Sequence, residues 1–274
     1  MSETSHYGVK EQTLSVTAID RAIEQLRLLG YAVLDGSYSR AELTQLQEAF
    51  CAARRKMEEH FGGKDSLEKI DEHNTIRIPM MYERVFLDLA LNQAIIELCR
   101  RMIGDYFILN QQNGISNPGN STRYNQGAFH RDLPYQHFVS DRPLAINALF
   151  CLDDFTTENG ATYVLPGSHK QSAYPSDATV DALKVQIPAP AGSFIILDCM
   201  LYHSGGVNRT DRERRAVNHV YSIPMLKQQI DLPAALGDTF SDDPGVRQLL
   251  GYDSTVPLDV AAYYRSRTKK KEFS

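Results

Sequence analysis

The chain has 274 residues, a length typical of one large domain or two small ones, and 42% of its residues are hydrophobic while 23% are charged. With 29 Lys and Arg against 34 Asp and Glu, its net charge of −5 argues against a nucleic-acid-binding protein. No apolar stretch approaches the ~20 residues that cross a bilayer. We therefore expect no membrane association. The four cysteines are scattered and form no C-x-x-C pair, so we expect a cytoplasmic protein with reduced cysteines.

The first hundred residues favour helices. Two helices are predicted to begin at capping boxes, one formed by Thr17 with Asp20 and the other by Ser39 with Glu42. Between them, "YAVLDG" predicts a short strand. A third helix is expected over residues 85–104, where apolar side chains recur at helical spacing.

The pattern changes after Gly104. Short stretches rich in β-branched and aromatic residues follow one another, separated by Gly, Pro and Asn; they are "YFILN", "INALFCLDDF", "ATYVLPG", "KVQIP", "SFIILD" and "AVNHVYSIP". This spacing is typical of a β-sandwich or barrel. We predict a mainly β fold with flanking helices, organised as one domain over 1–274. It has helical support over about 1–105, a jelly-roll core over about 106–226 and a helical segment over about 227–274.

Two potential metal ligands stand close together in "AFHRDLPYQHF". His130 and Asp132 are two residues apart, so on a strand their side chains point to the same face. An imidazole nitrogen with a carboxylate oxygen suits iron, manganese, zinc or nickel rather than calcium. A polar strand that binds no metal is the alternative.

A third ligand would come from His137, His169, His203 or His219. We favour His203, because it follows the apolar strand "SFIILD" and precedes a double-glycine turn that leaves room for a substrate. His219 lies in the middle of a strand, His137 is too near the pair to come from another strand, and His169 lies in a turn. Two histidines and one aspartate form the facial triad of Fe(II) oxygenases, which leaves coordination positions open.

An arginine follows the third histidine by one hairpin. The strand there begins with Arg214 and Arg215, and a guanidinium holds a carboxylate with two hydrogen bonds. Side chains alternate along a strand, so Arg214 shares one face with Ala216 and Asn218, and Arg215 points to the other. Periodicity alone does not say which arginine faces the metal.

Four stretches of the chain resemble the phytanoyl-CoA dioxygenase family of Fe(II)/2-oxoglutarate-dependent oxygenases. They are "LRLLGYAVLDGSYSRAEL", "FHRD", "LDDFTTENGATYVLPGSHK" and "HSGGVNRTDRERRAV". The resemblance implies a double-stranded β-helix core of the cupin type, with Fe(II) bound by His130, Asp132 and His203. It also implies that 2-oxoglutarate and O2 are cosubstrates and that Arg214 holds the distal carboxylate of 2-oxoglutarate.

Further contacts to 2-oxoglutarate are less closely matched to the family. Thr162 falls where some relatives use a hydroxyl to touch this cosubstrate. Leu149 replaces a tryptophan of several relatives, and Gly205 replaces a serine of some. We therefore predict additional polar contacts from Asn147, which shares a strand face with Leu149, and from Gln126, with Gln111 and Asn113 as alternatives.

The substrate is predicted to be a small molecule, such as a natural product, an amino acid or a lipid-like compound. Its predicted contacts are Arg131, Tyr135, His137 and Arg77, with a polar loop around the iron, or for Arg77 a surface salt bridge, as the alternative. The predicted reaction is hydroxylation of an unactivated C–H bond with release of succinate and CO2. Desaturation, epimerisation and ring formation by the same cofactors stay open, and so do a hydrolase or isomerase and a non-catalytic metal-binding jelly roll. The sequence does not predict an oligomeric state.

Overall fold

The computed structural model describes residues 7–9, 11–120, 127–133 and 138–272, with side chains described up to residue 267. The N-terminal helices are α1 (Ala18–Leu29), α2 (Arg40–His60), α3 (Lys64–Glu68), α4 (Val85–Ala90) and α5 (Gln93–Met102), with a 3-10 turn at Pro79–Met81. Further along lie α6 (Asp177–Leu183), α7 (Leu232–Leu236), α8 (Pro244–Leu250) and α9 (Val260–Glu272), with 3-10 turns at Ser168–Lys170 and Tyr252–Ser254.

Both predicted capping boxes are confirmed. The Thr17 side chain accepts from the Asp20 amide at the start of α1, and the Ser39 side chain accepts from the Glu42 amide at the start of α2. Each acidic side chain returns a bond to the backbone of its capping residue. Local hydrogen bonds within four residues therefore set both helix starts.

The helix predicted over 85–104 is wrong in its continuity. It is broken at Asn92, whose side-chain oxygen accepts from the amides of Ala94 and Ile95 and so begins α5. An asparagine side chain competes with the helix for backbone amides, and here it caps a new helix directly after α4 has ended at its Leu91 cap.

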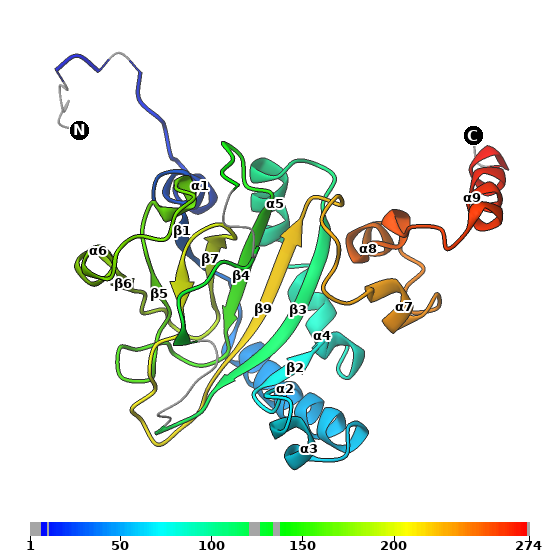
Figure 1. Ribbon diagram of the computed structural model, residues 1–274, viewed down its shortest axis with the longest axis horizontal. Coiled ribbons are helices and arrows are strands. Elements are labelled where there is room, and N and C mark those ends of the chain that lie inside the picture. Colours follow the sequence, from blue (N-terminus) through cyan, green and yellow to red (C-terminus); the bar gives the residue numbers. More distant parts are fainter. Residues whose placement is uncertain (1–6, 10, 121–126, 134–137, 273–274) are drawn as a thin grey trace.

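The strands form two antiparallel sheets (Figure 1). The larger has the order β1 (Tyr31–Asp35), β7 (Ser193–Asp198), β4 (Ala145–Cys151), β9 (Arg214–Ser222), β3 (Ile108–Asn117) and β2 (Thr75–Arg77). The smaller has the order β6 (Val185–Gln186), β5 (Tyr163–Val164) and β8 (His203–Ser204). The predicted jelly-roll core with flanking helices is confirmed, although β2 and β8 were not expected as strands.

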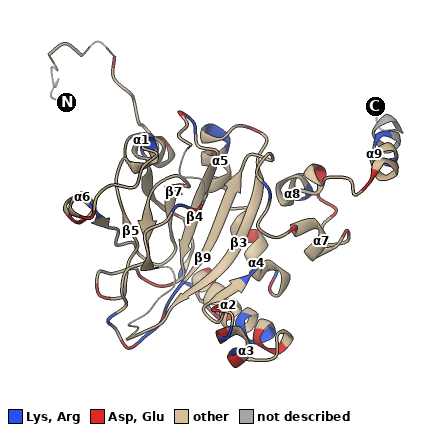
Figure 2. Cartoon of the chain, in the orientation of Figure 1, with Lys and Arg blue, Asp and Glu red and all other residues tan. Residues whose placement is uncertain are grey.

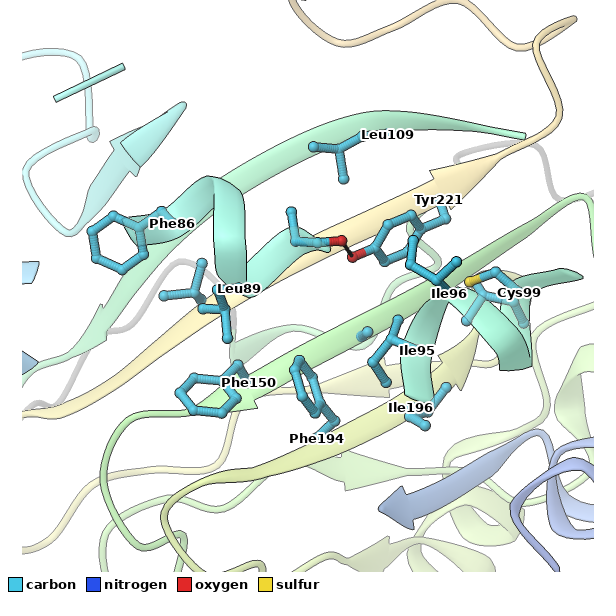
Figure 3. Packing of buried hydrophobic residues seen from close by; sticks show 14 of the residues in the cluster. Phe86, Leu89, Ile95, Ile96, Cys99, Leu109, Phe150, Phe194, Ile196 and Tyr221 are labelled. Carbon is cyan, nitrogen blue, oxygen red and sulfur yellow. Dashed lines mark hydrogen bonds between the residues drawn. The ribbon is translucent and has the colours of Figure 1, made fainter. Parts of the chain in front are cut away.

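Helices cover one face of the larger sheet. Figure 3 shows side chains of α4 and α5 packed against Phe150 of β4 and Phe194 of β7, whose ring centroids are 5.0 Å apart. The Tyr221 hydroxyl donates a 2.7 Å hydrogen bond to the Ala90 carbonyl at the end of α4. The opposite face of the sheet packs against the smaller sheet. The larger sheet is thus buried on both sides, and the space between the two sheets is where a site can form.

The C-terminal segment extends the helical layer. Leu249 and Leu250 of α8 belong to the same hydrophobic core as Ala22 of α1. Helix α9, by contrast, stands apart from the rest of the molecule in Figure 1. Charged residues gather on α2 and α3, while the middle of the long strands is free of them (Figure 2). Among the described residues, no helix combines the length and hydrophobicity needed to cross a bilayer. One domain over 1–274 stays our proposal.

His219 is buried in the helix-facing side of the sheet. Its Nδ1–H donates to the Ala148 carbonyl at 3.2 Å, so its Nε2 accepts from the side-chain amide of Gln112 at 3.0 Å. The same amide group also donates to the Phe86 carbonyl and accepts from the Met80 amide. Burial lowers the pKa of His219 to about 4. The imidazole is therefore a neutral and fully bonded part of the core.

This burial predicts that stability depends on pH. The ordinary pKa of His219 is 6.5, and its folded-state value is about 4. Below pH 6.5 the unfolded chain takes up a proton that the folded chain does not, so the free energy of unfolding falls by about 3 kcal/mol as the pH drops from 7 to 4. Urea unfolding at both pH values measures this loss. In His219→Gln the pH dependence is expected to shrink by that amount, and an unchanged dependence would contradict the assignment.

Candidate metal centre

The two candidate histidine ligands lie opposite each other across a β-bridge. The His130 amide donates to the His203 carbonyl at 2.9 Å, and the His203 amide donates to the His130 carbonyl at 3.0 Å. Their rings are adjacent, with centroids 4.4 Å apart. Asp132 lies in a bend just past the bridge rather than on a regular strand, and its Oδ1 is 3.7 Å from His203 Nε2. One ligand atom from each of the three residues lies within 4.8 Å of the others.

Hydrogen bonds set the tautomer of both histidines. The Nδ1–H of His130 donates to the Ala128 carbonyl at 2.8 Å, and that of His203 donates to the Leu201 carbonyl at 3.0 Å. Since carbonyls only accept, Nδ1 carries a proton in each ring, and Nε2 is the nitrogen that is left to bind a metal. Burial lowers the pKa of His203, which keeps its ring neutral. Neutral imidazoles with Nδ1 bound to a carbonyl are the form in which histidine binds metals, so the three residues fit a divalent ion.

The Asp132 carboxylate has two further neighbours. Its Oδ2 accepts a 2.8 Å hydrogen bond from Asn147 Nδ2, and the buried Cys199 thiol lies beside it. Burial, with the negative charge of Asp132, raises the pKa of Cys199 well above its usual value, so the thiol is neutral. Asn147, predicted to contact 2-oxoglutarate, lines the same pocket. Its side-chain amide, however, donates to the carboxylate of Asp132.

The two arginines at the start of β9 point to opposite faces of the sheet. Arg214 is buried, lines the pocket that contains the three candidate ligands, and stacks its guanidinium 3.9 Å from the centroid of the Phe155 ring. Arg215 turns away and pairs with Asp153 through two hydrogen bonds of 2.8 and 3.0 Å. The pocket therefore contains the guanidinium of Arg214 and not that of Arg215.

The rest of the pocket wall combines apolar and polar side chains. The predicted residue on it is Thr162, and Leu149 and Gly205, where the chain departs from the family pattern, lie there with Ala216. Sequence reasoning missed Ile115, Leu197, Ser204 and Phe155 as neighbours of the site. Strand alternation from Arg214 was enough to place Asn218 on this wall, whereas no sequence signal marked Phe155.

Two residues predicted to touch substrate lie elsewhere. Arg131 is buried and stacked 4.0 Å from the centroid of the Tyr202 ring, and it donates to the carbonyls of Ser168 and Gln171. Arg131 therefore connects the segment that contains His130 and Asp132 to the loop around Ser168 and Gln171. Arg77 forms a salt bridge with Glu72, which agrees with the alternative that we considered for it, a surface salt bridge. Neither side chain lines the pocket of the candidate ligands, and substrate contact by either residue stays a prediction.

The remaining candidates divide into two groups. Gln126, Tyr135 and His137 lie outside the described residues. His169, a rival third ligand, is buried against the Gly30 turn, with its Nε2 3.4 Å from the Arg27 carbonyl.

A family model places the chain among known proteins. The model for phytanoyl-CoA dioxygenase (PhyH) matches residues 26–216, which include all three candidate ligands and Arg214. The chain belongs to the phytanoyl-CoA dioxygenase family. Family membership makes it an enzyme, a dioxygenase among the oxidoreductases.

Relatives of this phytanoyl-CoA dioxygenase family member span nearly its whole length. An uncharacterized protein of Mycobacterium tuberculosis is 30% identical over 260 residues, which cover 93% of this chain and 94% of the relative. Dioxygenase af480 of Aspergillus fumigatus is 28% identical over 267 residues, covering 90% and 80%.

Solved structures share its fold. The apoform of EctD from S. alaskensis aligns with a TM-score of 0.61 at 22% identity, covering 85% of this chain and 84% of that one. The epimerase SnoN, in complex with Fe3+, alpha ketoglutarate and nogalamycin RO, aligns with a TM-score of 0.58 at 20% identity, covering 83% and 91%.

Proposed function

We propose that this Fe(II)/2-oxoglutarate-dependent dioxygenase hydroxylates an unactivated C–H bond of a small molecule, using Fe(II) held by His130, Asp132 and His203. The cofactor class follows from the family and from relatives named iron/alpha-ketoglutarate-dependent dioxygenases. The assignment of residues is our own. The observation that carries it is the clustering of these three side chains in one pocket with Arg214.

The number of ligands favours a catalytic over a structural metal. Structural zinc sites are normally filled by four protein ligands, whereas catalytic sites keep positions open. Within the described part of the chain, the cluster contains three residues that can bind an ion. A non-catalytic jelly roll or a hydrolase would have no use for a buried arginine aimed at the same pocket, which a dicarboxylate cosubstrate requires.

Each residue of the pocket then has a task. The two imidazoles and one carboxylate hold the ion, and Arg214 holds the distal carboxylate of 2-oxoglutarate with its planar fork. Thr162 adds a hydroxyl beside that cosubstrate. Fe(II), when bound, would supply the oxidising chemistry that couples the conversion of 2-oxoglutarate and O2 into succinate and CO2 to hydroxylation of the substrate. The apolar side chains of Leu149, Leu197 and Ile115 exclude water, which strengthens the ionic contacts within the pocket.

Hydroxylation is the outcome that we propose, and desaturation, epimerisation and ring formation stay open. Solved structures with the same fold include EctD with 2-oxoglutarate and 5-hydroxyectoine, but also the epimerase SnoN. The three-residue ligand set, which includes a carboxylate, is compatible with all of them. The small-molecule substrate and a cytoplasmic location are part of the proposal.

Turnover of 2-oxoglutarate provides the test. With Fe(II), O2 and 2-oxoglutarate, the purified protein is expected to form succinate and CO2 slowly even without its substrate, and to stop when the metal is chelated. Succinate is measured by chromatography, with Arg215→Ala as an active control and His203→Ala as an inactive one. Failure to form succinate from iron-loaded protein, together with hydrolysis or isomerisation that ignores 2-oxoglutarate, would favour the rival functions.

A further inference from the structure

The two oxygens of the Asp132 carboxylate have different environments. Oδ1 faces the histidines and lies 3.7 Å from His203 Nε2. Oδ2 faces β4 and accepts the 2.8 Å hydrogen bond from Asn147. The Cys199 thiol also lies beside this carboxylate, but a thiol is a weak donor. Without the amide bond, the carboxylate would be freer to rotate and to offer an ion either oxygen or both, which changes the number of open positions left for other ligands.

The donor of this bond sits on a much stiffer element than the acceptor. Asn147 is buried on β4, which is hydrogen-bonded to β7 on one side and to β9 on the other, and its register partners are Leu197 and Val220. Asp132 lies in a bend beyond the single bridge formed by His130. The hydrogen bond therefore anchors a ligand on an irregular segment to the middle of the larger sheet.

The amide can point only one way. An ionised carboxylate is an acceptor, so the Asn147 nitrogen must face Asp132, and turning the amide over would set oxygen against oxygen. Its Oδ1 is buried and makes no hydrogen bond among the described residues, which is unfavourable in itself. The buried oxygen makes asparagine less stabilising at this position than an apolar residue of similar size. The contribution that an apolar residue could not make is the hydrogen bond to Asp132. Being neutral, the amide holds the carboxylate without cancelling its charge.

We propose that Asn147 is a positioning residue for the metal centre: it holds Asp132 so that a single oxygen, Oδ1, is presented to the ion. This rests on the proposed iron site. This role differs from the predicted contact between Asn147 and 2-oxoglutarate. The Asn147 amide donates to Asp132, and this hydrogen bond is present before any cosubstrate binds.

The test measures metal binding rather than turnover. Asn147→Leu keeps a similar volume and removes the donor. The metal-free variant is titrated anaerobically with Fe(II), and separately with Co(II), whose visible absorption bands report the ligand geometry. Loss of an outer hydrogen bond to a metal ligand typically weakens metal binding about 10–100-fold, and we expect a loss in that range together with altered Co(II) bands. Asn147→Gln, which retains the amide, should recover part of the affinity.

Matched variants separate the possible failures. Asn218→Leu changes the same residue type on the same pocket wall, where the described hydrogen bonds include none from Asn218 to Asp132, so its metal affinity and Co(II) bands should match the wild type. Wild-type metal affinity and Co(II) bands in a folded Asn147→Leu protein would overturn the proposal, as would a loss confined to 2-oxoglutarate affinity. If Asn147→Leu does not fold, Asn147→Ala is judged by the same criteria. Wild-type metal affinity in His203→Ala would instead show that the iron site itself is misplaced.

Discussion

His203→Ala is expected to weaken Fe(II) binding by more than about 100-fold and to abolish turnover of 2-oxoglutarate. Loss of a group that only supports a metal ligand costs about 10–100-fold, so loss of the ligand itself should exceed that range. His203 is well suited to this variant because its Nδ1 bond to Leu201 is local and its backbone bridge to His130 does not need the imidazole. Anaerobic calorimetry with Fe(II) measures the effect.

The buried His219 is the control for His203. It lies on the other side of the sheet, bonded to Gln112 and Ala148, so its replacement should lower stability at neutral pH and leave metal affinity intact in the folded protein. The thermal unfolding of both metal-free variants shows how much of any loss comes from the fold. Our choice of third ligand would be wrong if His219→Ala lost iron while His203→Ala retained it.

Arg214→Ala is expected to cripple 2-oxoglutarate binding while leaving Fe(II) binding unchanged. Removing one partner of a buried guanidinium–carboxylate pair costs about 2–5 kcal/mol, which is about 30-fold to several thousandfold in affinity. The stacking of Arg214 on Phe155 already holds the guanidinium in place, so little order is lost on binding. Arg214→Lys should restore only part of the affinity, because an ammonium lacks the planar fork.

The neighbouring arginine offers a matched control. Arg215 is paired with Asp153 on the opposite face of β9, and its replacement should leave 2-oxoglutarate affinity close to that of the wild type. Titration of each iron-loaded variant with 2-oxoglutarate, followed by the metal-to-ligand charge-transfer band, compares them directly. A damaged Arg215→Ala with an intact Arg214→Ala would contradict the role that we assign to this face of the strand.

These variants also show how far local sequence rules extend. The helix starts at Thr17 and Ser39 depend on hydrogen bonds spanning three residues, so the capping pattern was enough to predict them. The opposite directions of Arg214 and Arg215 follow from the alternation of side chains on any strand. By contrast, the break at Asn92 in the third helix was not predicted. The apolar spacing on either side of Asn92 is that of one continuous helix, and only the structure shows that its side chain caps α5.

The sequence by itself determined the fold class, the family and the chemical types of the candidate ligands, because each depends on periodicity or on motifs within a short stretch. Only the tertiary structure decided which distant groups meet. The bridge between His130 and His203 brings the candidate ligands together, and the pairing of β4 with β7 and β9 gives Asn147 its place beside Asp132. Arg131 stands between two candidate ligands in the chain, but its side chain contacts Tyr202 and loop carbonyls instead. The physical reason is that such contacts depend on strand order and register, which are set by the packing of the whole core.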